Sequence, residues 1–140
     1  MLPDADVIGF ALGIDYADEW GHRGASHALA LAVMVIGALA LVWREARTLP
    51  AFAFLALAMA SHGLLDALTD GGLGVALLWP YDTARLFAPF TPIRVSPIGA
   101  GFFSLRGLET LVSEMVWVWL PCGLAAAMGV IGRRKPRLSD

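Results

Sequence analysis

The stretch ASHALALAVMVIGALALVW, residues 25–43, decides the class of fold. Its polar residues, Ser26 and His27, both lie near its beginning, and the rest is apolar. Coiled as an α-helix, a stretch of this length reaches about 28 Å, close to the roughly 30 Å hydrocarbon core of a bilayer. We therefore predict a transmembrane helix here, which ends at the charged residues that begin with Arg44.

Two further apolar stretches predict two more spans. The first, residues 51–68, is polar only near its far end, and the second, residues 115–132, contains no charged residue. Between them, residues 70–106 are rich in glycine, proline and aromatic side chains, which predicts a loop at the bilayer surface. The expected architecture is all-α: a single membrane-embedded helical domain over residues 1–140 with about three transmembrane helices.

Composition agrees with a bilayer as the solvent. The chain is 58% hydrophobic and 16% charged, with a mean hydropathy of +0.68, whereas a soluble domain has about 25% charged residues. Membrane lipids are therefore the expected surroundings. No basic stripe with interleaved aromatic residues is present, so no nucleic-acid partner is expected. The lone Cys122 can form no intrachain disulfide and is interpreted as a small apolar residue.

Basic residues near the helix ends predict the orientation. Arg44 and Arg47 join the first two predicted spans, and a basic cluster at residues 133–137 follows the third. Because cytoplasmic loops are enriched in lysine and arginine, three crossings would place all of these bases in the cytoplasm. The residues before the first span and the 70–106 loop then face the non-cytoplasmic side.

Histidines and carboxylates gather on that non-cytoplasmic side. His62 and Asp66 are four residues apart, which puts them on one helix face within reach of one ion. Gly24 separates His22 from His27, so a loop ending at His22 and a helix capped by Ser26 could turn both rings toward one point. Imidazole and carboxylate are ligands that zinc and similar divalent metals accept.

Each of these residues also has a simpler interpretation. His62 hydrogen-bonded to Asp66 at the membrane interface would need no metal, and His22 and His27 taken singly fit a loop residue and an interfacial residue. Asp4 and Asp6 could form a solvated acidic N-terminus, although a loop after Pro3 could present both to a cation. Burial within a membrane protein favours a site, because ionisable groups there are costly and usually functional.

Three sequence blocks resemble a known family. LPDAD (2–6), HRGASH (22–27) and SHGLLDALT (61–69) are similar to blocks of the YdjM-like inner-membrane proteins, which are described as metal-dependent hydrolases. The resemblance covers nearly the whole chain, because the WPY stretch (79–81), Arg85 and the final spans follow in the same order. It implies a multi-pass protein of the bacterial inner membrane.

The resemblance also implies a site, carried over residue by residue. A metal ion, with zinc the expected one, would be bound by Asp4, Asp6, His22, His27, His62 and Asp66, with Arg23 close by. Two departures stand out. Ser26-His27-Ala28 replaces the usual Thr-His-Ser, and members commonly carry an apolar, histidine-bearing helix ahead of the Pro-Asp-x-Asp block, so we expect such a helix to be missing from this sequence.

The leading hypothesis is a metal-dependent hydrolase that acts on an ester or phosphoester of a lipid-like substrate at the membrane interface. Asp66 or another acid not bound to metal would act as general base, and Arg23 or Arg85 would offset developing phosphate charge. The alternative is a non-catalytic membrane protein that binds a metal ion or an anionic headgroup, and a third hypothesis is a plain helical subunit. Because three spans are few to enclose a polar site, a homo-oligomer is a further option, which no motif supports.

Overall fold

The computed structural model describes residues 2–133, and the described residues are helical apart from turns, loops and isolated β-bridge residues, among them the pair Val75 and Leu86. The predicted all-α class is confirmed. Most of the basic cluster at residues 133–137 lies outside the described residues. The chain forms two compact units, Met1–Thr91 and Pro92–Asp140, and each is described by itself.

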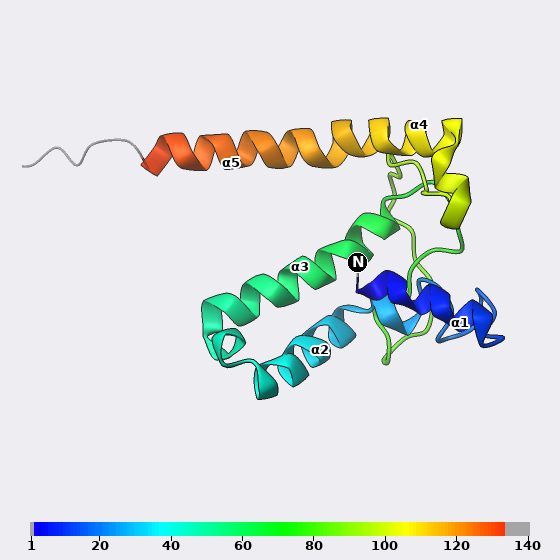
Figure 1. Cartoon of the computed structure of the whole chain (residues 1–140), viewed down its shortest axis with the longest axis horizontal. Helices are drawn as coiled ribbons and strands as arrows, with labels where there is room; N and C mark the ends of the chain where they lie inside the picture. Colours follow the sequence, from blue (N-terminus) through cyan, green and yellow to red (C-terminus); the bar gives the residue numbers. More distant parts are fainter. Residues whose placement is uncertain (1, 134–140) are drawn as a thin grey trace, which may run out of the picture. The chain divides into compact units, whose positions relative to one another are not determined.

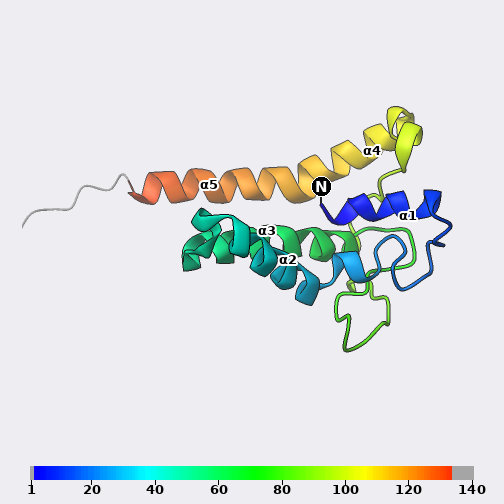
Figure 2. The same ribbon diagram turned by 60° about the horizontal axis from the view of Figure 1, so that its bottom comes forward.

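A helical hairpin forms the core of the first unit. Helix α2 (Leu29–Val42) and helix α3 (Leu49–Ala67) lie side by side, joined by the 3₁₀ helix η3 (Arg44–Arg47) (Figures 1 and 2). The buried residues of the two helices are mostly small, and they are Ala32, Ile36, Ala56, Gly63 and Ala67. Small residues allow two helix backbones to approach closely, which is the usual way in which helices associate in membranes.

The closed end of the hairpin is fixed by Arg47. Its guanidinium donates hydrogen bonds of 2.7 Å to the carbonyl oxygens of Ala40 and Leu41 in the last turns of α2. Those carbonyls have no partner within the helix at its C-terminal end, and a cation there also interacts favourably with the helix dipole. Arg47 therefore ends α2 and directs the chain into α3.

The first predicted span is shorter than expected. Helix α2 begins at Leu29 rather than at residue 25, because residues Ala25–His27 form a separate 3₁₀ turn, η2, and Ala28 is extended (φ −69°, ψ 143°). No side chain caps α2, so the predicted capping role of Ser26 is wrong. Fourteen helical residues reach about 21 Å, whereas the 19 residues of α3 reach about 28 Å.

The second unit is dominated by one long helical segment. Helix α4 (Leu105–Glu114), the π-helical turn η5 (Met115–Trp119) and helix α5 (Leu120–Arg133) follow one another without a break. The helix thus begins ten residues before the predicted span at 115. Pro121 has no backbone N–H to give to the carbonyl four residues earlier, which accounts for a local change in helical pitch here.

Within residues 2–133, two helical segments are long and apolar enough to cross a membrane, Leu49–Ala67 and Leu105–Gly132, and α2 is a shorter apolar helix. The segment predicted as an interfacial loop, 70–106, contains the 3₁₀ helix η4 (Gly99–Phe103) and the start of α4. The part of this segment that belongs to the first unit, residues 70–91, folds back on the open end of the hairpin.

Backbone hydrogen bonds tie that part of the segment down. The amide of Ala76 donates to the carbonyl of Arg23 at 3.0 Å, and the amide of Leu29 donates to Leu77 at 3.1 Å. Val75 is fully buried. These contacts hold the entrance of α2 against the segment that follows α3.

Gly63 sets how closely the hairpin can approach η2, because a Cβ at position 63 would collide with the backbone carbonyl of His27. We predict that Gly63→Ala destabilises the protein by about 1–3 kcal/mol, as overpacking in a close-packed interior does. Thermal unfolding in detergent, followed by circular dichroism, measures this change.

Gly37→Ala is the matched control, since a Cβ at position 37 in α2 meets nothing within 4 Å. It should leave the stability unchanged or raise it by up to about 1 kcal/mol, because alanine favours a helix. Equal effects of the two substitutions would show that the close approach at Gly63 is unimportant.

Candidate metal centre

The open end of the hairpin receives two acids from the N-terminal segment. The 3₁₀ helix η1 (Pro3–Val7) carries Asp4 and Asp6, and the short helix α1 (Ile8–Ala11) follows it. Pro3 is buried at the start of η1, where its fixed φ suits a helical turn. With three residues per turn, residues two apart in a 3₁₀ helix are separated by about 120° around its axis, so both can face one side of the helix. Both carboxylates therefore reach the histidines.

The histidines come from three segments. His22 lies in the loop before α2, His27 ends η2, and His62 lies in the penultimate turns of α3. The ring centroids of His22 and His27 are 5.5 Å apart, and those of His27 and His62 are 5.1 Å apart. The predicted convergence of the histidines is present in the structure.

One group of four side chains offers ligand atoms that all lie within 4.8 Å of one another: Asp4, His27, His62 and Asp66. Nε2 of His27 lies 3.1 Å from Oδ2 of Asp66 and 3.6 Å from Oδ1 of Asp4. Nε2 of His62 lies 3.1 Å from Oδ1 of Asp4 and 3.7 Å from Oδ2 of Asp66. Two imidazole nitrogens and two carboxylate oxygens therefore face a common point.

Two of these facing atoms have no hydrogen-bond partner although they are buried: Nε2 of His27 and Oδ2 of Asp66. The His27 side chain is fully buried, so water cannot supply a partner from bulk solvent. Leaving a buried polar atom unsatisfied costs about 1–3 kcal/mol, and more for a charged group. A cation at the shared point would remove that cost for both atoms, so the residues fit a divalent metal ion.

The electrostatics of the centre favour positive charge. Burial by itself would lower the pKa of His27, but the neighbouring carboxylates of Asp4, Asp6 and Asp66 outweigh burial and raise its pKa to about 10. Burial would raise the pKa of Asp4, yet the imidazoles of His27 and His62 hold that pKa well below its usual value. The centre thus binds a proton tightly, and a metal ion would compete for the same position.

A second group, Asp6, His22 and His27, adjoins the first through His27. Oδ1 of Asp6 lies 2.7 Å from Nδ1 of His22. Oδ2 of Asp6 accepts a hydrogen bond of 2.5 Å from the hydroxyl of Ser26 and one of 3.2 Å from the backbone N–H of Arg23. Burial would raise the pKa of Asp6, but its hydrogen bonds, that with His22 foremost, hold the pKa well below the usual value.

Arg23 holds Asp66 in position and links it to the segment that follows α3. Its guanidinium donates to Oγ1 of Thr69 at 2.8 Å and to the carbonyl of Gly71 at 3.0 Å, and it lies 3.2 Å from Oδ1 of Asp66. Arg23 is 4% exposed and has a positive φ of 65°, which is uncommon for a residue with a side chain. Gly72, at φ 87°, leaves the room that the guanidinium needs.

Arg85 lies outside the group of four. Its guanidinium donates to the backbone carbonyls of His22, Tyr16 and Asp18 at 2.8–2.9 Å. These contacts hold the loop that carries His22, so the structure gives Arg85 a supporting position. The predicted contact of Arg23 or Arg85 with a substrate phosphate stays a prediction.

Sequence reasoning overlooked two contributors. The sequence predicts that Ser26 caps a helix, whereas its hydroxyl lies between Asp6 and Nδ1 of His27, at 2.9 Å from the latter. Thr69 was not singled out, although it holds Arg23 and also donates to the carbonyl of Asp66. The sequence did offer a signal: Ser26 directly precedes His27, and Thr69 follows Asp66 by three residues.

A buried cluster of histidine and aspartate at the open end of an apolar helical hairpin, with two helices long enough to span a bilayer, defines a helical membrane protein with a candidate metal centre. The chain belongs to the YdjM inner membrane protein family, whose profile matches residues 1–136. Localisation in the inner membrane and the recognised family are thereby confirmed.

A curated relative supports the same assignment. The chain is 39% identical over 132 residues to the inner membrane protein YbcI of Escherichia coli strain K12, an alignment that covers 91% of this chain and 76% of that protein. No solved structure matches the chain.

The pairing of Arg23 with Asp66 yields a stability prediction. Arg23→Ala should destabilise the protein by about 3–5 kcal/mol, because it leaves a buried carboxylate without its partner. In the double variant Arg23→Ala/Asp66→Ala the loss should be smaller than the sum of the two single losses, by at least about 1 kcal/mol. Chemical unfolding of the four proteins measures this coupling, and strictly additive losses would contradict it.

Proposed function

We propose that the protein is a membrane-bound hydrolase that uses a divalent metal ion, with zinc the expected one, bound by Asp4, His27, His62 and Asp66. The observation that carries the proposal is the pair of buried, unpartnered atoms, Nε2 of His27 and Oδ2 of Asp66, that face each other with two further ligand atoms around them. Nitrogen and oxygen donors of this kind are typical of zinc sites.

The ion would supply a Lewis acid that polarises an ester or phosphoester and makes water more acidic. The protein's own residues would orient the substrate and deprotonate the attacking water. Asp66 has one oxygen toward Arg23 and the other toward the ligand group, so its expected role as general base would pass to Oδ2 of Asp4, since Asp4 faces the two imidazoles with Oδ1. The side chain of Asp4 is 38% exposed, against 15% for Asp66, and can exchange a proton with water.

The substrate would reach the centre from the Asp4 side, since that is its most exposed carboxylate. Exposed apolar side chains of Leu2 and Ile8 flank Asp4 along the chain. An apolar rim beside a polar centre suits an amphipathic ester, and a membrane lipid or a lipid-like molecule has that character.

Metal content and turnover test the proposal together. Purified wild-type protein should contain one zinc ion per chain and hydrolyse a generic phosphoester or ester, or a phospholipid in mixed micelles, with loss on chelation and recovery on adding zinc. His62→Ala and His27→Ala should lose both metal and turnover, because each removes a ligand. Asp82→Asn is the matched control, as Asp82 is exposed and caps only the amide of Ala84.

A non-catalytic metal-binding protein is the second candidate, and the count of ligands favours it. Structural zinc sites are closed by four protein ligands, whereas catalytic sites keep one position open, and this group offers four. Stoichiometric zinc without hydrolysis of any of these substrates would establish the second candidate. Metal content unchanged in both histidine variants would contradict both candidates.

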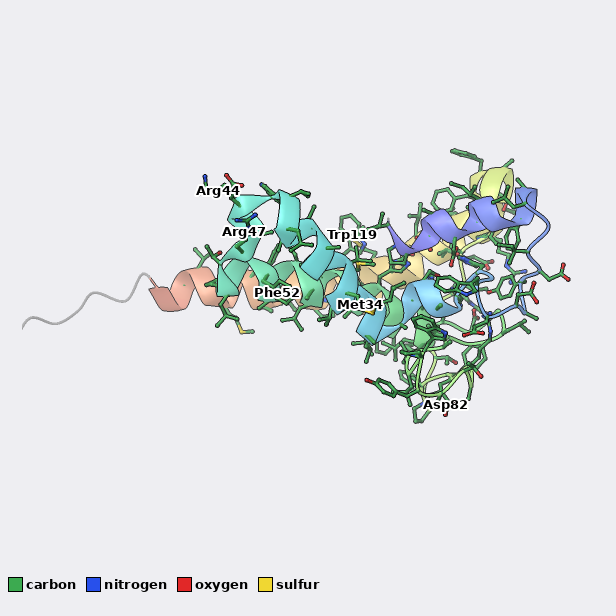
Figure 3. The ribbon with its side chains drawn as sticks, turned by 90° about the horizontal axis from the view of Figure 1, so that it is seen from below. Met34, Arg44, Arg47, Phe52, Asp82 and Trp119 are labelled. Atoms are coloured by element: carbon green, nitrogen blue, oxygen red, sulfur yellow. The ribbon has the colours of Figure 1, made fainter. Side chains whose placement is uncertain are left out.

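The hairpin also supports a multi-pass topology with the centre on the non-cytoplasmic side. Figure 3 shows Arg44 and Arg47 at one end of the hairpin and Asp82 beyond the other end. The ends are separated by the 19 residues of α3, about 28 Å. With the arginine end in the cytoplasm, as basic loops prefer, the centre would lie at the opposite face.

Cysteine labelling tests this orientation. In a Cys122→Ser background, Asp82→Cys should react with a membrane-impermeant maleimide in cells whose outer membrane has been opened, because its position faces outward. Thr48→Cys, exposed at the arginine end, should react only after the inner membrane is permeabilised. The reverse pattern would place the centre in the cytoplasm.

A further inference from the structure

We infer that Asp6 is a positioning residue rather than a metal ligand. It keeps the ring proton of His22 on Nδ1 by a direct hydrogen bond, and it keeps the ring proton of His27 on Nδ1 through the hydroxyl of Ser26. This inference rests on the metal site proposed above and assigns Asp6 a different role from Asp4, its neighbour in η1. It also assigns one ion, not two, to the neighbouring side-chain groups.

The contacts of Asp6 leave little room for a cation. Its side chain is 6% exposed. Three donors form hydrogen bonds with it: Nδ1 of His22 at 2.7 Å, the hydroxyl of Ser26 at 2.5 Å and the backbone N–H of Arg23 at 3.2 Å. Nδ1 of His27 also lies 3.3 Å from its Oδ2. An ionised carboxylate only accepts hydrogen bonds, so each of the three donors must turn a hydrogen toward it.

The single hydroxyl hydrogen of Ser26 then determines the tautomer of His27. Because that hydrogen points at Asp6, the oxygen of Ser26 can only accept from Nδ1 of His27, 2.9 Å away. The chain of donors runs from His27 Nδ1–H to Ser26 and from Ser26 O–H to Asp6. Nε2 of His27 is then the ring nitrogen whose lone pair is available to an ion at the point that it shares with Asp4, His62 and Asp66.

A hydrogen-bonded carboxylate behind a ligating histidine is the arrangement that fixes ring orientation at metal sites, and removing it typically weakens metal binding about 10–100-fold. Here one carboxylate serves two rings, through its two oxygens. A second ion between Asp6, His22 and His27 would have to displace the N–H and O–H hydrogens that Asp6 already accepts. The second group of side chains therefore supports the first rather than forming a second centre.

Asp6→Asn tests the inference because the amide keeps the shape and replaces one acceptor oxygen with a donor. Zinc should bind about 10–100-fold more weakly, still at one ion per chain, and the visible spectrum of the cobalt-substituted protein should keep the wild-type band shape. Asp4→Asn removes a ligand and should change that spectrum. Asp6→Glu, which restores two acceptor oxygens, should recover part of the lost affinity, and Asp82→Asn should alter neither property.

The wild-type protein offers a second readout if a variant fails to fold. Nitrogen-15 NMR of the zinc-loaded, histidine-labelled protein should show Nδ1–H on His22 and His27, and a metal-shifted Nε2 on His27. Two zinc ions per chain, Nε2–H on His27, a changed cobalt spectrum in Asp6→Asn, or no metal bound by the wild type would each overturn the inference. Zinc binding without hydrolysis would overturn only the hydrolase proposal.

Discussion

The contact on which the rest of the site depends is the approach of two buried atoms, Nε2 of His27 and Oδ2 of Asp66, to 3.1 Å, where neither has a hydrogen-bond partner. The other oxygen of Asp66, Oδ1, is held by Arg23, and the other nitrogen of His27, Nδ1, is held by Ser26. The protein therefore brings together groups that repel each other unless positive charge lies between them. Such an arrangement is costly in a protein interior and is found where it serves a site.

The fold supplies what this approach requires. Gly63 allows the backbone of His27 to reach α3, and the extended Ala28 separates η2 from α2 so that the ring can turn inward. Arg23 adopts a positive φ that places its backbone N–H on Asp6 and its guanidinium on Asp66. Strained backbone of this kind persists when surrounding contacts fix it, and it is concentrated at functional sites. Stability and site geometry are thus set by the same few contacts.

Hydropathy and spacing predicted the all-α class, the α2–α3 hairpin and the gathering of the three histidines, because these depend on periodicity and on which helix ends meet. The early start of α4 was not predicted, because Arg106 and Glu109 interrupt the apolar run although a helix need not be apolar. The distinction between Asp4 and Asp6 was also beyond the sequence. It depends on which lone pair faces which hydrogen, and that follows only from the contacts of Ser26.

The most direct measurement of the central claim is X-ray absorption at the zinc edge of the purified, zinc-loaded protein. The account predicts four nitrogen and oxygen neighbours at about 2.0–2.2 Å, with the multiple-scattering signature of two imidazoles, from His27 and His62. A spectrum with three imidazoles would bring His22 into the coordination sphere and contradict the assignment of Asp6. A spectrum without imidazole, or a protein that retains no zinc, would contradict the metal centre itself.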